Sequence, residues 1–267
     1  MAACMKLSGL ISIIALLVSC SKVNEVATEL LISDAQEVEM GRNFKEQIEA
    51  DTENFPLYTS KAGYNVNLDR YIDSIGQCLV NSQNDRTDIE YHFTIIDMDT
   101  VINAFAVPGG FIYIYTGLIL NARNEAEIAG VLAHELGHIT KRHGARQMVK
   151  QAGIDFVLDL VAGEESSLRT ALDIASGFMF LKYSRDNEYQ ADSCSVEYLT
   201  LAGYNPNGMK TFLEYLGSLN NYDWGVLTES ISTHPSSDKR VDSVEVLIDT
   251  KPASVTSRAI PSKSYNP

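Results

Sequence analysis

The stretch Asn124–Gly144, with the sequence NEAEIAGVLAHELGHITKRHG, contains the pattern that decides the fold, HELGH at positions 134–138. Its first asparagine can cap a helix, and the glutamates that follow complement the positive end of the helix dipole. Because an α-helix has about 3.6 residues per turn, His134 and His138 share one face and can bind one zinc ion. Glu135 is offset by about 100°, so its carboxylate can reach a water molecule on that ion.

A purely structural role is the weaker explanation of this motif. The surrounding helix is apolar, so two histidines and a glutamate buried there without a metal would need other polar partners. Gly137 costs about 1 kcal/mol relative to alanine inside a helix. A second backbone in close approach at this position would explain that cost.

A catalytic zinc site needs a third protein ligand and an open position for water. His143 does not complete the HExxHxxGxxH pattern, so we interpret it as a cation at the helix end or a surface residue. Glu188 is the better candidate, in a second predicted helix that starts at Ser184. Asp192 lies one turn further on the same face, where it can accept a hydrogen bond from a ligand imidazole. Taken alone, this acidic pair would be typical of a solvated helix face.

The remaining pattern predicts a mainly helical α+β fold. Apolar residues at helical spacing indicate packing helices over Ser33–Ala50 and Asn67–Val80. Alternating apolar residues and a Pro-Gly-Gly turn predict three strands, at Tyr91–Ile96, Ile102–Val107 and Phe111–Tyr115. We therefore expect a helical bundle around the HELGH helix, together with a small β-sheet. Gln147–Tyr183 is predicted to form a helical hairpin whose acidic residues exclude a membrane span.

Residues 1–19 have the pattern of a bacterial lipoprotein signal peptide. One lysine precedes an apolar run too short to span a bilayer, and Leu17-Val18-Ser19-Cys20 resembles a lipobox. We expect Cys20 to be lipidated at the start of a linker over residues 20–32, which gives a membrane anchor. An uncleaved anchor and an ordinary cleaved signal are the alternatives. A lipoprotein of this kind is expected in the periplasm. Ser21 favours anchoring in the outer rather than the inner membrane.

Composition indicates one globular domain over residues 33–250, followed by a flexible tail over residues 251–267. With 21 Lys+Arg against 35 Asp+Glu, the net charge of -14 excludes a basic face for nucleic acid. Past the lipobox Cys20, the cysteines are Cys78 and Cys194. Two isolated cysteines are more often buried small hydrophobes than a disulfide pair.

Three further segments accompany HELGH. Glu188-Tyr189-Gln190-Ala191-Asp192 begins fifty residues after the second histidine of HELGH. Asn103-Ala104-Phe105-Ala106-Val107-Pro108-Gly109-Gly110 precedes the helix, and Ser232-Thr233-His234-Pro235 follows, with Arg240 six residues after His234. In this order the segments resemble the gluzincin metallopeptidases of the CAAX prenyl protease, HtpX and BepA type, peptidase family M48. The resemblance spans roughly Ser33 to Ile248 and implies a zincin-like metalloprotease fold.

The resemblance also implies the parts of a catalytic site. One zinc ion per chain would have three protein ligands, His134, His138 and Glu188, with Glu135 as general base. His234 would stabilise the oxyanion or occupy the open zinc position as a plug; by itself, a histidine before proline is more often a turn or surface residue. Arg240 could pair with an active-site carboxylate, although a surface arginine is the commoner case. An edge strand would align the substrate backbone through Asn103, Ala104, Phe105 and Ala106.

We therefore expect a zinc endopeptidase of the bacterial cell envelope that hydrolyses misfolded or misassembled proteins. Its partners would be these unfolded substrates and the membrane that holds its lipid anchor. The alternative is an outer-membrane protein assembly chaperone with little or tightly regulated proteolysis. A purely structural lipoprotein would require every motif to be an accident.

Overall fold

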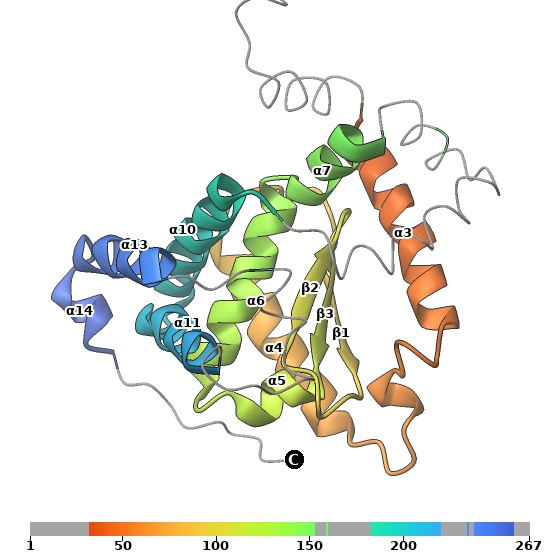
Figure 1. Ribbon diagram of the computed structural model, residues 1–267, viewed down its shortest axis with the longest axis horizontal. Coiled ribbons are helices and arrows are strands. Elements are labelled where there is room, and N and C mark those ends of the chain that lie inside the picture. Colours follow the sequence, from red (N-terminus) through yellow and green to blue (C-terminus); the bar gives the residue numbers. More distant parts are fainter. Residues whose placement is uncertain (1–31, 153–158, 160–182, 220–233, 235–237, 259–267) are drawn as a thin grey trace, which may run out of the picture.

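The computed structural model describes residues 32–152, 159, 183–219, 234 and 238–258. In this part of the chain, helices pack around one three-stranded sheet, which confirms the mainly helical α+β prediction (Figure 1). The helices are α3 (Asp34–Ala50), η1 (Tyr58–Ser60), α4 (Val66–Ser82), α5 (Thr116–Asn121), α6 (Glu125–Thr140), α7 (His143–Ala152), α10 (Arg185–Ala202), α11 (Asn207–Leu219), α13 (Asp238–Asp249) and α14 (Ala253–Thr256). The strands are β1 (His92–Ile96), β2 (Ala104–Val107) and β3 (Phe111–Tyr115).

The sheet has the order β1-β3-β2 and confirms the three predicted strands. β3 pairs in parallel with β1 and antiparallel with β2, in a register that places Phe105 opposite Tyr113. The first two strands start later than predicted, at His92 and Ala104. β2 is therefore an edge strand of the described sheet, and it lies next to α6 (Figure 1).

Both faces of the sheet are covered by helices. Side chains alternate along a strand, so Ala104 and Ala106 face the core formed with α4, α6, α10 and α11. Phe105 and Val107 face the opposite core, which includes Met40 and other buried residues of α3. Figure 1 shows the same arrangement, with α3 and α6 on opposite sides of the strands. A sheet covered on both faces is a rigid support for residues at its edge.

The central helix α6 is buried along almost its whole length, from Ala126 to Thr140. Its N-terminus is capped as expected, because Asn124 Oδ1 accepts a hydrogen bond from the Glu127 amide at 3.0 Å. Gly137 explains how α10 comes so close. A Cβ atom at this glycine would lie 2.9 Å from Cys194 Cβ and 3.2 Å from Ala191 Cα. The predicted close approach of a second backbone is thus confirmed.

The end of α6 differs from the prediction. The helix ends at Thr140, Arg142 adopts a left-handed conformation with φ 56°, and His143 begins a new helix, α7. His143 is 0% exposed, so its interpretation as a helix-end cation or surface residue is wrong. The left-handed residue interrupts the helix between α6 and α7, and the His143 imidazole that follows lies in the interior.

A buried ion cluster joins α3 to the end of α6. Glu37 of α3 is 0% exposed, and its carboxylate oxygens lie 3.0 Å from Arg86 Nη1 and 2.7 Å from Arg142 Nε. Arg86 also pairs with Asp34 and donates to the Ile139 carbonyl at 3.0 Å. The charge of Glu37 therefore holds Arg142 in the turn that places His143.

The C-terminal segment 251–258, the described part of the predicted tail, contacts the rest of the domain. It contains α14, and Val255 of that helix is 8% exposed. The side chain of Asn205 donates to the carbonyls of Thr256 and Arg258 at 3.1 and 2.7 Å. These hydrogen bonds and the burial of Val255 explain why the segment is folded, while residues 259–267 lie outside the described part.

Other sequence predictions fall partly or wholly outside the described residues. These are the signal peptide and the lipidated Cys20, most of the linker over residues 20–32, and most of the predicted hairpin between Gln147 and Tyr183. Within the described part, no helix combines the length and the apolar character that crossing a bilayer requires. Cys194 is buried as expected, whereas Cys78 is exposed, and both thiols are free.

Candidate active site

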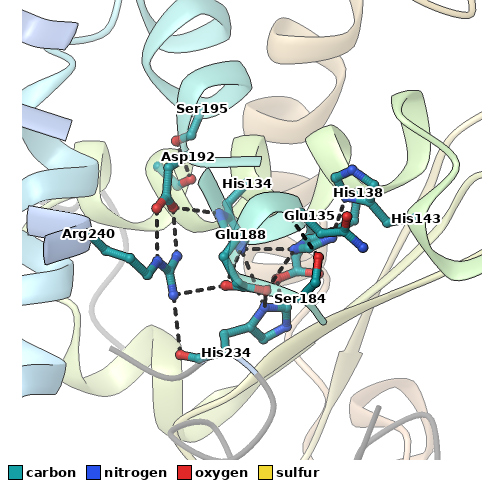
Figure 2. A network of polar contacts seen from close by, with 12 residues as sticks. His134, Glu135, His138, His143, Ser184, Glu188, Asp192, Ser195, His234 and Arg240 are labelled. Atoms are coloured by element: carbon teal, nitrogen blue, oxygen red, sulfur yellow. Dashed lines mark hydrogen bonds and ion pairs between the residues drawn. The ribbon is translucent and has the colours of Figure 1, made fainter. Parts of the chain in front are cut away.

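Four buried side chains from distant parts of the chain converge beside β2. They are His134 and His138 of α6, Glu188 of α10, and His234, which precedes α13 (Figure 2). One potential ligand atom from each residue lies within 4.8 Å of the others. The helical spacing of HELGH and the tight contact of α6 with α10 bring the first three together.

The distances in this cluster fit a single zinc ion. His134 Nε2 lies 3.0 Å from His138 Nε2, and the Glu188 carboxylate oxygens lie 3.6 Å from each of these nitrogens. Ligand atoms bound tetrahedrally at about 2.0–2.1 Å from zinc are about 3.3 Å apart. Two imidazoles and one glutamate are also a donor set that zinc takes in catalytic sites. The three side chains thus fit a metal ion in both chemistry and spacing.

His234 lies at the fourth corner of the cluster. Its Nδ1 is 3.0 Å from Glu188 Oε1 and 3.4 Å from His134 Nε2, while its Nε2 is 3.6 Å from Glu135 Oε1. The side chain is therefore placed to contact both the metal position and the predicted base.

Glu135 is a buried carboxylate between the cluster and the edge strand. Burial raises its pKa above the usual value, although His234 and His134 oppose the shift. A hydrogen bond with the backbone of Ala106 in β2 also lowers the pKa of the Glu135 carboxyl group. Its Oε2 is buried without a hydrogen-bond partner among the described residues. An oxygen with free acceptor capacity and a raised pKa suits proton transfer from a water molecule at the metal.

Asp192 and Arg240 fix the orientation of His134 from its Nδ1 side. Asp192 Oδ1 lies 3.0 Å from His134 Nδ1, and Arg240 binds the same carboxylate through Nε at 2.8 Å and Nη2 at 2.6 Å. Burial alone would raise the pKa of Asp192, but the hydrogen bonds and charge of Arg240 outweigh it and lower the pKa to about 2. The carboxylate keeps the proton of His134 on Nδ1 and leaves Nε2 free for a metal.

Arg240 also contacts the other ligands. Its Nη1 lies 2.9 Å from Glu188 Oε2 and donates to the His234 carbonyl at 3.2 Å (Figure 2). The side chain is 3% exposed, so the alternative of a surface arginine is wrong. One guanidinium therefore connects a glutamate of α10 with the segment that contains His234.

The predicted substrate-binding residues divide between two sides of the sheet. Asn103 and Ala104 line a cavity of about 30 Å³ that also borders Glu135 and His234. Phe105 points the other way and stacks on Tyr113 with ring centroids 5.0 Å apart. The backbone of β2 and the two small alanines thus border the cluster, whereas the Phe105 ring does not.

Three residues near His138 were not predicted as part of the site. His143 Nδ1 lies 2.9 Å from His138 Nδ1, and His143 Nε2 lies 3.0 Å from Gln190 Oε1. The Tyr183 ring stacks on His138 with centroids 4.1 Å apart. No spacing rule could have found His143, because the left-handed turn at Arg142 breaks the helical period before it.

Burial favours the neutral form of both histidines on this side, because it lowers their pKa values. Burial lowers the pKa of His138 well below its usual range, and the neighbouring His134 and His143 lower it further. Burial also lowers the pKa of His143 to about 4, although the hydrogen bond with Gln190 opposes the shift. A neutral imidazole is the form that binds metal or accepts a hydrogen bond.

A helix with two histidines and a glutamate, a further glutamate from a second helix, and an edge strand beside them define a metalloprotease with a zincin-like fold. The family model of Peptidase family M48 matches residues 67–248, more than half of the chain. The chain therefore belongs to peptidase family M48.

Individual relatives agree with this assignment. The putative beta-barrel assembly-enhancing protease of Vibrio cholerae is 34% identical over 186 residues, which cover 65% of this chain and 38% of that protein. The beta-barrel assembly-enhancing protease of Escherichia coli is 30% identical over 223 residues, 79% of this chain and 43% of that protein. Metalloprotease YcaL of Escherichia coli is 36% identical over 152 residues, 55% of this chain and 58% of that protein. The chain spans less than half the length of the two assembly-enhancing proteases.

Proposed function

We propose that this chain is a zinc-dependent endopeptidase that cleaves misfolded or misassembled proteins of the bacterial cell envelope. The observation that carries the proposal is the buried Oε2 of Glu135, which has no hydrogen-bond partner among the described residues and lies next to a cluster with the donor set of catalytic zinc. Family membership supports a peptidase, and the names of two relatives, beta-barrel assembly-enhancing proteases, support substrates in the envelope.

His134, His138 and Glu188 would hold the zinc ion. When bound, zinc lowers the pKa of a water molecule to about 7 and polarises a substrate carbonyl. Glu135 would accept a proton from the attacking water molecule as its oxygen adds to the carbonyl carbon, and would donate that proton to the amine nitrogen released when the C–N bond breaks. Asp192 keeps His134 in the tautomer that a metal requires. The outer edge of β2, which pairs with no strand of the described sheet, would align an extended substrate by backbone hydrogen bonds, which favours broad specificity for unfolded chains.

The location is part of the same proposal. The lipobox at Cys20 supports a lipid anchor, which would hold the domain in the periplasm at a membrane, with the outer membrane favoured. The excess of acidic over basic residues supports protein rather than nucleic acid as the partner.

The position of His234 favours a second candidate function. With Nδ1 3.0 Å from Glu188 and 3.4 Å from His134, it can act as a fourth protein ligand and fill the position that water needs. In that case the chain would be an assembly chaperone that binds its clients and cleaves them only when His234 moves away.

The test compares the full chain with its Glu135→Gln variant. Both are expected to contain one zinc per chain by elemental analysis, but only the wild type should hydrolyse casein. The rate of casein hydrolysis should fall by about 10²-fold to 10⁴-fold, the usual contribution of a general acid–base group. A chelator should stop the wild-type reaction, and added zinc should restore it. Normal turnover by Glu135→Gln, or no zinc in the wild type, would overturn the proposal.

Replacement of His234 separates the two candidates. If His234 blocks the metal position, His234→Ala should cleave casein faster than the wild type. If His234 stabilises the oxyanion, the same variant should lose about 10²-fold to 10³-fold in kcat with little change in KM. Zinc content measured in parallel shows that either change does not come from loss of metal.

A further inference from the structure

We propose that His143 is a positioning residue for His138, and that Gln190 fixes the hydrogen-bonding state of His143. The inference rests on the proposed function, because His138 must be a metal ligand for it to hold. It assigns a role to a histidine that the HELGH motif does not include and that comes from the next helix, α7. The juxtaposition that carries it is the contact chain His138–His143–Gln190, with nitrogen–nitrogen and nitrogen–oxygen distances of 2.9 and 3.0 Å.

The first step concerns the proton on His138. Its Nε2 faces the cluster, 3.0 Å from His134 Nε2 and 3.6 Å from Glu188 Oε1. A neutral imidazole has one N–H and one lone pair, so binding a metal through Nε2 puts the proton on Nδ1. That proton needs an acceptor, since the ring is only 1% exposed. His143 Nδ1 lies 2.9 Å from His138 Nδ1 and is the acceptor. His143 Nδ1 must then be unprotonated.

The second step concerns His143 itself. With Nδ1 accepting from His138, its own proton is on Nε2, where Gln190 Oε1 accepts it at 3.0 Å. A reversed amide of Gln190 would donate to Nε2 and drive the proton to Nδ1, where two N–H groups would face each other. One assignment therefore satisfies all three side chains, and it leaves the His138 lone pair directed at the metal position.

The third step separates positioning from packing. His143 is 0% exposed, and α7 also contains buried apolar residues such as Met148, so a ring at this position could simply fill space. A packing role needs only a side chain of similar volume. A positioning role needs an acceptor at the place of Nδ1, because a second partner of a metal-binding histidine fixes its tautomer and orientation. The two roles thus predict different results for apolar and polar replacements.

The experiment measures the zinc affinity of the full chain by competition with a chromophoric chelator. His143→Leu removes the acceptor and should weaken zinc binding by about 10-fold to 100-fold. His143→Asn places an amide oxygen near the position of Nδ1 and should recover most of this loss. Met148→Ala is the matched control in the same helix, because it removes buried volume, and it should lower the thermal stability without changing zinc affinity.

Wild-type zinc affinity in His143→Leu would overturn the positioning role while leaving the proposed function intact. Equal losses in His143→Leu and His143→Asn would also overturn it, because packing would then explain both. If the leucine variant does not fold, Gln190→Leu tests the chain of contacts from its exposed end and should weaken zinc binding a few-fold; no change would count against the inference. A wild-type chain that takes up no zinc would instead overturn the proposed function.

Discussion

The two imidazoles of the HELGH helix are supported in different ways. His134 contacts Asp192, a buried carboxylate that Arg240 binds at 2.8 and 2.6 Å. His138 contacts His143, a neutral ring whose other nitrogen meets an exposed amide. A carboxylate partner increases the basicity of its imidazole as well as fixing the tautomer, whereas a neutral acceptor mainly fixes the tautomer and orientation. Asp192 and Arg240, the charged side of the site, thus raise the basicity of His134. His143 and Gln190, the neutral side, mainly orient His138.

The two sides also differ in how much stability the fold loses when one partner is removed. On the charged side, each group is buried and depends on its counter-ion, so removal of one partner leaves an uncompensated charge. On the neutral side, removal of one partner leaves at most an unsatisfied hydrogen bond. We therefore expect substitutions on the charged side to affect stability more strongly than those on the neutral side.

The largest effect is expected for Arg240→Met. It leaves Asp192 buried without its counter-ion, which should lower the free energy of unfolding by about 3–5 kcal/mol. Urea unfolding of the metal-free chain measures this. Lys239→Met, at the exposed neighbouring position, is the matched control and should change stability by less than about 0.5 kcal/mol. If both variants unfold like the wild type, the charged side does not stabilise the fold.

A smaller effect is expected for Gly137→Ala, which tests whether both sides depend on the same helix contact. The new Cβ would lie 2.9 Å from Cys194 Cβ, so α10 must shift together with Glu188 and Asp192. Overpacking should destabilise the chain by about 1–3 kcal/mol and weaken zinc binding. A stability gain of about 1 kcal/mol, as helix propensity alone predicts, would show that the contact between the helices is not tight.

The smallest effect is expected for Asp192→Asn, which keeps an acceptor for His134 but removes the charge. Zinc affinity should fall by about tenfold, at the lower end of the range for partners of metal-binding histidines. The comparison with His143→Asn sharpens the contrast, because that substitution also keeps an acceptor but changes no formal charge on a neutral ring. Equal zinc affinity in Asp192→Asn and the wild type would show that the charge does not tune the ligand.

The charged side was within reach of sequence analysis, and the neutral side was not. Glu188 and Asp192 are one helical turn apart, so a known helical period places both on the face that meets HELGH. His143 depends on a single left-handed residue, Arg142, which a buried glutamate holds from more than a hundred positions away. A local pattern contains no information about such a contact.

The same reasoning explains the other results. The three strands and the capped α6 follow from alternation and from Asn124, both of which are local signals. The short helix in segment 251–258 was not predicted, because Asn205, far along the chain, supplies hydrogen bonds to this segment. Resemblance to a family indicated His234 and Arg240, which composition and spacing alone would have placed on the surface.

The buried cluster around Glu37 makes α3 part of the folding unit, although this helix precedes the match to the family model. The family match begins at residue 67, whereas α3 ends at Ala50. A chain trimmed to the boundary of that match would remove the anion of Arg86 and Arg142 and would uncover the Phe105 side of the sheet. We therefore expect a fragment that begins at residue 67 to aggregate on expression, whereas a fragment that begins at Ile32 keeps α3 and its contacts with Arg142.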